Sequence, residues 1–211
     1  MQKITFISTM HKNHGKCNAD ELCSILVKED PEVIFLEAIE TTYSNYDRLR
    51  FSSFGAYHEK LEIEAIQKYS HHASFKYIPA LDNELPESFK KKYESLVINS
   101  QLKEMLDELT TLVGTRGFEF LNSQLGMALH KRMRILESQV LNDNELNNDV
   151  NLGIDTYENS MMQNIYAYCK ANRFNKGVFM CGAAHRESLI EKIRNFNDKE
   201  ELSIDWTIYG D

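Results

Sequence analysis

The chain has 211 residues, with 24 Lys and Arg against 32 Asp and Glu, so its net charge is −8 at pH 7 with neutral histidines. An acidic chain lacks the basic surface that nucleic acid phosphates require, so we expect no nucleic acid partner. A hydrophobic share of 42% suffices for one domain at this length, and the four cysteines are expected to be reduced packing residues. No apolar run approaches the ~18 residues of a membrane span, and Met1 leads almost directly into a strand. We therefore expect no signal peptide, no membrane contact and a cytoplasmic protein.

The first part of the chain alternates strands with helices. Apolar runs predict strands at 3–8, 33–36 and 75–78, and helices are expected at about 20–27 and 57–72. This strand–helix–strand order predicts strands that are parallel and are neighbours or near neighbours in the sheet. Residues 38–56 are aromatic and polar, and they suit a substrate wall or an ordinary surface loop equally.

The alternation stops after Asp82. Residues 87–141 are predicted to be helical, with a break at 114–117, and 142–151 are rich in Asn and Asp and predict a mobile loop. A helix at 156–171, a strand at 178–181, a helix to 196 and a strand at 202–209 complete the chain. We predict a single α/β domain over 1–211: a mostly parallel central sheet flanked by helices, with a helical insertion (87–150) after the third strand that could act as a lid.

Four polar side chains lie within four residues of the carboxyl ends of the predicted strands. They are His11, Glu37, Asp82 and His185. Parallel strands would place them along one edge of the sheet, where open α/β sheets bind ligands. Two imidazoles with carboxylates suit a divalent metal ion, which would activate a bound water for hydrolysis. A histidine acting as general base, oriented by a carboxylate and without metal, is the alternative.

Polar residues elsewhere are expected on solvated helix faces. These are His58, Glu59, Glu62, Glu64, Lys90, Lys91, Lys92 and His130. His71 and His72 are expected at the carboxyl end of a helix, where they interact favourably with the helix dipole. His14 could join His11 as a ligand, although three-residue spacing in a loop differs from that of a zinc-binding helix.

Two short segments, Ser8-Thr-Met-His11 and Gly182-Ala-Ala-His185, resemble the paired G-x-x-H motifs of the TraB/TIKI superfamily. That group includes PrgY-like proteins and looks related to erythromycin esterases and ChaN-like proteins. Other segments also resemble parts of the family: the strand 33–37 ending in Glu37, the segment 61–65, and the helix 157–165. The resemblance covers roughly 3–82 and 156–209. The chain departs from the family pattern at Ser8 (usually Gly), at 157–158 (where an Arg is expected) and at Met162 (usually Ala).

The resemblance implies an α/β fold and, for some members, metal-dependent peptidase activity; other relatives hydrolyse esters. It implies that this activity uses the two histidines and the glutamate, His11, His185 and Glu37. We expect these three to hold a manganese, zinc or cobalt ion. The candidate catalytic residues are Glu37, Asp82, and Glu158 or Glu64 as acid/base. The leading hypothesis is therefore a metalloprotease-like hydrolase that acts on a peptide or a small-molecule ester. A metal-free esterase and a non-catalytic binding or regulatory protein are the alternatives, and the sequence leaves open a homo-oligomer.

Overall fold

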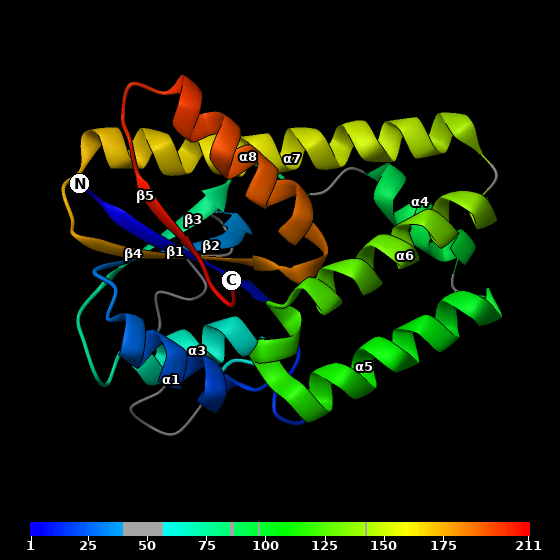
Figure 1. The fold of residues 1–211 in the computed structure, drawn as a ribbon, viewed down its shortest axis with the longest axis horizontal. Coiled ribbons are helices and arrows are strands. Elements are labelled where there is room, and N and C mark those ends of the chain that lie inside the picture. The colour runs from blue at the N-terminus through cyan, green and yellow to red at the C-terminus, as the bar shows by residue number, and fades with distance from the viewer. Residues whose placement is uncertain (40–56, 85–86, 97, 142) are drawn as a thin grey trace.

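The protein is described by a computed structural model that covers residues 1–39, 57–84, 87–96, 98–141 and 143–211. The strands of these residues form one five-stranded sheet in the order β3-β2-β4-β1-β5, and every neighbouring pair is parallel (Figure 1). The strands are β1 (Lys3–Thr9), β2 (Val33–Ile39), β3 (Lys76–Leu81), β4 (Lys176–Gly182) and β5 (Asp205–Ile208). The predicted α/β class, with its parallel sheet and helical insertion, is confirmed.

Helices cover both faces of this sheet (Figure 1). On one face, α1 (Ala19–Glu29) and α3 (Leu61–Tyr69) form a core with the sheet; Leu22 and Ile66 belong to it. On the other face, α7 (Asn144–Ala171) and α8 (Arg186–Lys199) form a second core that includes Ile165 and Leu189. Because both faces are covered, the central strands are nearly continuous apolar runs, as expected for a parallel sheet.

The order in which the chain adds strands to the sheet reverses direction near the centre of the sheet. From β1 the chain moves through β2 to β3 at one edge, whereas β4 lies between β2 and β1, and β5 lies beyond β1. Right-handed crossovers in opposite directions place their helices on opposite faces, as observed. Such a reversal opens a crevice at the carboxyl ends of the strands, which is where ligands bind in this class of sheet.

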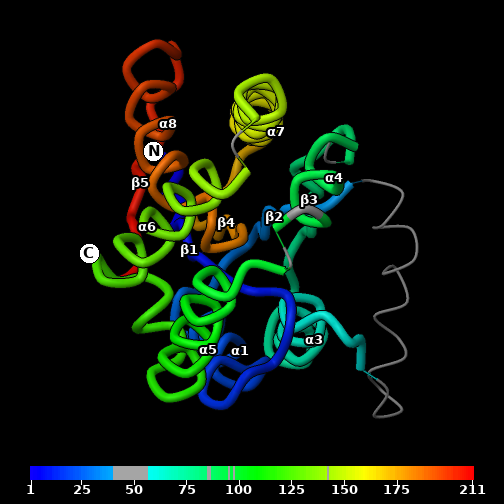
Figure 2. The backbone as a smooth tube through the Cα atoms, turned by 90° about the vertical axis from the view of Figure 1, so that its right-hand side faces the viewer, coloured from blue at the N-terminus to red at the C-terminus, as the bar shows by residue number. Residues whose placement is uncertain are grey.

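The helical insertion projects beyond these carboxyl ends (Figures 1 and 2). It consists of α4 (Glu87–Leu96), α5 (Ser100–Leu121), α6 (Gln124–Leu141) and the first turns of α7. Asn99 and Asp143 cap α5 and α7 by accepting hydrogen bonds from backbone N–H groups. None of the helices in the described ranges is long and apolar enough to cross a bilayer.

The structure corrects one prediction about this insertion and confirms another. Residues 143–151 are not a mobile loop, because Asp143 is the N-cap of α7 and the helix then runs unbroken to Ala171. The first turns of α7 are mostly exposed, so apolar side chains do not recur in them at helical spacing. Val150 is buried there and anchors these turns in the interior. The expected break at 114–117 is a kink confined to Gly117, whose φ of 61° favours glycine.

A buried arginine joins the insertion to the sheet. The Arg186 guanidinium donates to the carbonyl oxygens of Asn122 (2.8 Å) and Tyr209 (2.8 Å) and is 1% exposed. The Asn122 side chain in turn bonds the backbone N–H and C=O of Ser8 in β1. The end of β1, the α5–α6 junction and the carboxyl-terminal segment are therefore held together beside His185.

Candidate active site

Strands β2 and β4 bring Glu37 and His185 together. Leu36 pairs with Met180, so the next residue, Glu37, lies beside the end of β4. A short 3-10 helix, η2 (Ala183–His185), follows β4 and turns the His185 ring back over this edge. Nε2 of His185 lies 3.7 Å from Oε1 of Glu37, and the two side chains are only 9% and 8% exposed.

The Glu37 carboxylate accepts three hydrogen bonds. The backbone N–H of Gly182 (2.7 Å) and the Cys181 thiol (3.1 Å) donate to Oε2, and the Tyr157 hydroxyl (2.9 Å) donates to Oε1. Burial by itself would raise the pKa of Glu37, but the charge of His185 and these donors outweigh it and lower the pKa below its ordinary value. Glu37 is therefore an ionised, fixed carboxylate. Burial and the charge of Glu37 raise the pKa of the Cys181 thiol, so it remains protonated and able to donate.

A second carboxylate holds the other nitrogen of His185. Nδ1 lies 2.8 Å from Oε1 of Glu158, which is 0% exposed. The Ser188 hydroxyl donates to the other oxygen of Glu158, and Nζ of Lys192 lies 3.9 Å from that same oxygen. Donation of Nδ1–H to Glu158 leaves Nε2 with its lone pair towards Glu37. Helices α7 and α8 thus fix one tautomer and one orientation of the ring.

Glu62 holds His11 in the same way as Glu158 holds His185. Nδ1 of His11 lies 3.0 Å from Oε1 of Glu62, which also accepts from the Thr9 hydroxyl at 2.9 Å. The hydrogen bond to Glu62 raises the pKa of His11, against the opposing effect of burial, and the charges of Glu62 and Glu37 add to the rise. A small cavity of about 50 Å³ is lined by His11, Glu37 and Glu62 together. His11 therefore lies at the same edge of the sheet as Glu37.

Two of the predicted site residues lie elsewhere. Glu64 accepts from Asn13 (2.9 Å) and pairs with Lys68 (2.8 Å) on the outer side of α3. Asp82 is exposed and accepts a hydrogen bond from Ser160 at 3.0 Å. Neither forms a described contact with His185. The segment 40–56, the main part of the expected substrate wall, lies outside the described residues.

Several residues expected on solvated faces are in fact buried or half-buried, among them Glu62, Lys92 and His130. Glu62 is 3% exposed, and the helical period of the inner face of α3 would have indicated this, because position 62 precedes Ala65 and Ile66 by three and four residues. Lys92 is 4% exposed and forms an ion pair with Glu137. His130 is half-buried, and burial, followed by the charges of Arg134 and His185, lowers its pKa to about 4.

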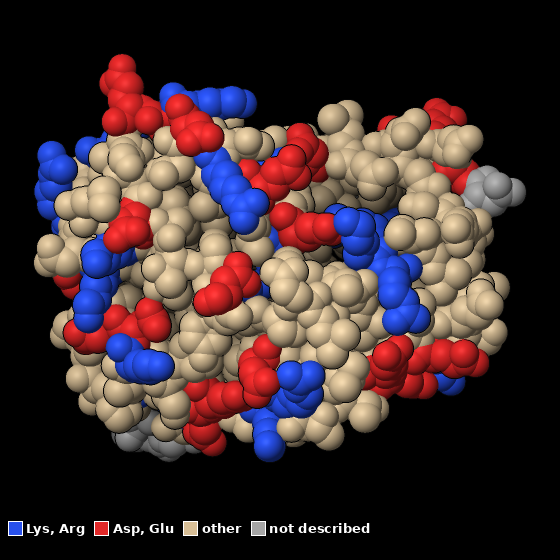
Figure 3. Space-filling view, in the orientation of Figure 1, with Lys and Arg blue, Asp and Glu red and all other residues tan. Residues whose placement is uncertain are grey.

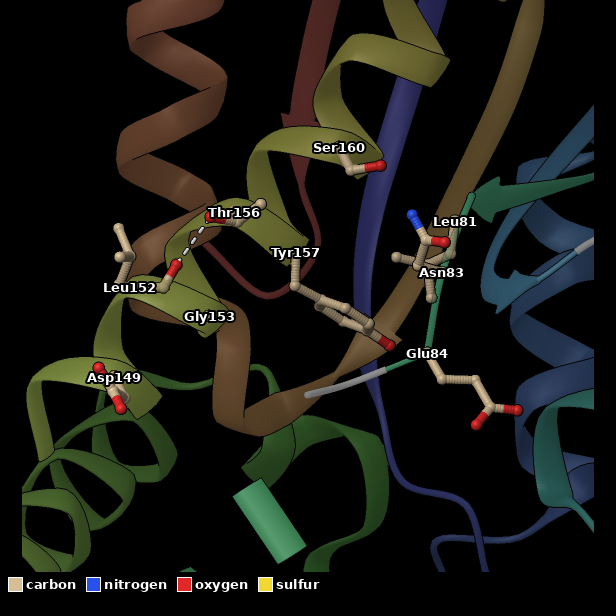
Figure 4. Close-up of a pocket in the computed structure, with 9 residues that line it drawn as sticks. All are labelled: Leu81, Asn83, Glu84, Asp149, Leu152, Gly153, Thr156, Tyr157 and Ser160. Carbon is tan, nitrogen blue, oxygen red and sulfur yellow. Dashed lines mark hydrogen bonds between the residues drawn. The ribbon is translucent and has the colours of Figure 1, made fainter. Parts of the chain in front are cut away.

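Two larger cavities flank the Glu37–His185 pair. One of about 370 Å³ lies between α7 and the segment after β3, where Tyr157 extends from α7 towards Asn83 and Glu84 (Figure 4). The other, of about 580 Å³, is lined by α4, α5, α6, α7 and η2, and His185 forms part of its wall. The candidate base is therefore in contact with a cavity large enough for an organic ligand.

The predicted three-ligand metal centre is not assembled by the described residues. A metal ion needs donor atoms within about 2.0–2.2 Å of one point. Glu37 and His185 could share an ion at their 3.7 Å separation, but no group of three His, Cys, Asp or Glu within the described ranges could hold one. The residues described therefore do not fit a preformed metal site.

No protein-family model, no curated protein and no solved structure matches the chain. The resemblance to the TraB/TIKI superfamily therefore stays a prediction based on short motifs. The α/β class rests on the sheet topology, and any function must be argued from the site.

Proposed function

We propose that the protein is a hydrolase that cleaves an ester or peptide bond with His185 as general base. The observation that carries this proposal is the buried His185–Glu158 pair, in which Nδ1 is held at 2.8 Å and Nε2 is turned towards Glu37 beside a ligand-sized cavity. An imidazole oriented in this way by a carboxylate is a common general base in hydrolases.

The geometry suits activation of a water molecule. Because Nε2 and Oε1 of Glu37 are 3.7 Å apart, one water can hydrogen-bond to both at ~2.8 Å. His185 would take a proton from this water as its oxygen attacks the carbonyl carbon, and would return the proton to the leaving alcohol or amine. While His185 carries this proton, its imidazolium ring lies between the Glu37 and Glu158 carboxylates, which stabilise it.

His11 supplies the complementary charge. Its raised pKa favours the imidazolium, and its ring is held by Glu62 at the same edge of the sheet. A cation there would stabilise the negative charge that develops on the carbonyl oxygen. The arginine that the resemblance leads one to expect at 157–158 is absent. We assign to His11 the role of stabilising the negative charge on the carbonyl oxygen.

The proposal is tested with a panel of chromogenic esters and fluorogenic peptides, each with and without EDTA. We expect hydrolysis of at least one class, unaffected by EDTA, and a loss of about 10²–10⁴-fold in kcat/KM for His185→Ala. Circular dichroism and urea unfolding verify that the variant is folded. Activity that His185→Ala leaves unchanged would exclude His185 as the base.

A metal-dependent hydrolase is the second candidate. Its support is that both histidines hold Nδ1 on a buried carboxylate, His11 on Glu62 and His185 on Glu158. Metal-ligating histidines usually have such a partner behind them. Loss of activity in EDTA, recovery with manganese, cobalt or zinc, and a lower bound metal content in His11→Ala would select this candidate over the metal-free one.

A further inference from the structure

The cavity beside His185 has an elongated apolar lining. Its wall includes six apolar side chains: Leu96, Leu102, Leu106, Leu109, Met133 and Ile154. Helix α5 begins far from the sheet and ends against it, so these residues extend from the sheet edge out between the projecting helices (Figure 1). The volume of about 580 Å³ lies within the range of about 300–1,000 Å³ that ligand pockets occupy.

Two ionisable groups of this lining, Lys92 and Glu137, form a buried ion pair. Nζ of Lys92 lies 2.7 Å from Oε2 of Glu137, and both side chains are buried. Arg134 donates to the carbonyl oxygen of Ala184 at 2.6 Å. His130 is neutral at pH 7 because its pKa is lowered to about 4 by burial and by the charges of Arg134 and His185. The cations Arg134 and Lys103 also line the cavity, and Lys103 is exposed. The buried part of the wall, where Lys92 and Glu137 neutralise each other, favours an uncharged, apolar occupant.

Acidic and basic side chains are interspersed over the outer surface on the face in Figure 3. An apolar cavity with a catalytic histidine in its wall is the arrangement of a pocket that binds one part of a substrate and presents its reacting bond to the base.

We infer that this cavity holds the apolar chain of the substrate, which is an ester of a medium- or long-chain carboxylic acid. The inference rests on the proposed function for its chemistry. The chain extends from His185 towards Leu106, and the carbonyl carbon lies beside the water that Nε2 activates. Water adds its oxygen to the acyl carbon, the bond from that carbon to the alcohol oxygen breaks, and the alcohol leaves with the proton that His185 carried. The products are the acid and the alcohol, and no other reactant is needed.

The first test measures kcat/KM for the p-nitrophenyl esters of acetate, butyrate, octanoate and decanoate, each below its aggregation concentration. Burial of one methylene corresponds to a factor of about 4, so we expect a steep rise with chain length. Leu106→Trp fills part of the cavity, and Leu106 is 44% exposed, so the larger ring can be accommodated. The ratio of decanoate to acetate kcat/KM should fall at least about tenfold in this variant.

Leu125→Trp is the matched control, because Leu125 is 52% exposed on α6 and is not part of the cavity wall. The control should keep the chain-length ratio of the wild-type protein. An equal fall in both tryptophan variants, or a flat chain-length profile in the wild-type protein, would overturn the inference.

The second test is binding of 1-decanol, measured by calorimetry. A neutral alcohol avoids repulsion from Glu37. Saturable binding that Leu106→Trp weakens and Leu125→Trp does not would support the cavity as the site of an apolar chain. If neither an ester nor a peptide is then hydrolysed, the proposed function fails while the apolar-chain site stands. Hydrolysis of acetate with no chain-length effect and no decanol binding would overturn the inference and leave the proposed function standing.

Discussion

The Nδ1 atom of His185 donates a hydrogen bond to the Glu158 carboxylate across 2.8 Å, in the space between α8 and α7. Glu158 has no exposed surface, so its charge is directed at the ring and at two groups on α8, the Ser188 hydroxyl and the Lys192 ammonium. This relationship determines which nitrogen of His185 is available for chemistry. It also makes Glu158 a positioning residue, because it acts through His185.

Glu158→Gln tests that role. The amide oxygen can still accept from Nδ1, but the negative charge that stabilises the imidazolium is lost, so we expect kcat to fall by roughly 10²-fold with little change in KM. The same substitution at Glu187, which is exposed on α8 and pairs with Lys131, should leave kcat within about twofold. A rise in KM with kcat intact would assign Glu158 to substrate binding instead.

The paired histidine, His11, predicts a pH-dependent contribution to stability. Its pKa is raised above the ordinary 6.5 by the hydrogen bond to Glu62, so its stabilisation is fully present below pH 6.5 and is lost as the pH rises through the raised value. His11→Gln should therefore lower the free energy of unfolding more at pH 5.5 than at pH 9. Because the His11 side chain is 55% exposed, the difference should be under about 1 kcal/mol. Urea unfolding at the two pH values measures it, and a larger loss at pH 9 would contradict the ion pair.

Arg186 predicts a larger effect on stability. Removing its guanidinium leaves the carbonyls of Asn122 and Tyr209 without their buried donor, so Arg186→Met should lower the free energy of unfolding by about 3 kcal/mol or more. Arg194, exposed on the same helix, provides the control: Arg194→Met should cost less than about 0.5 kcal/mol. Equal urea midpoints for the two variants would show that the buried network does not stabilise the fold.

The proximity of Glu37 and His185 could be predicted from the sequence, because both follow apolar strands and parallel strands end at one edge of the sheet. The partners of the two histidines were harder to predict. Glu62 lies 51 residues from His11, and only the helical period of α3 indicates that it is buried. Asp82 also follows a strand, yet it is exposed and bonded to Ser160, because position after a strand does not determine where a side chain turns.

The insertion shows a different limit of prediction. Its helical character followed from leucines at helical spacing, but the cavity depends on how α4, α5, α6 and α7 pack against each other, which no local pattern encodes. The start of α7 was predicted as a loop because Asn and Asp favour turns, although here Asp143 serves as a helix cap. The expected three-ligand metal centre likewise depended on side-chain directions, and among the described residues these assemble pairs instead.

Tyr157→Phe tests the electrostatics of Glu37. The Tyr157 hydroxyl donates to Oε1 of Glu37, and its ring packs 5.7 Å from that of His185. This donor is one of the groups that keep the pKa of Glu37 below its ordinary 4.5, so its loss should raise that pKa. If an ionised Glu37 orients the attacking water, its protonation adds a second, more acidic fall in kcat/KM to the one set by the His185 base, and this second fall should shift to higher pH in Tyr157→Phe. The profile is measured from pH 4 to 8 beside Tyr166→Phe, which removes a hydroxyl on the same helix that bonds Asn197. A shift in both variants, or in neither, would contradict a direct effect of Tyr157 on Glu37.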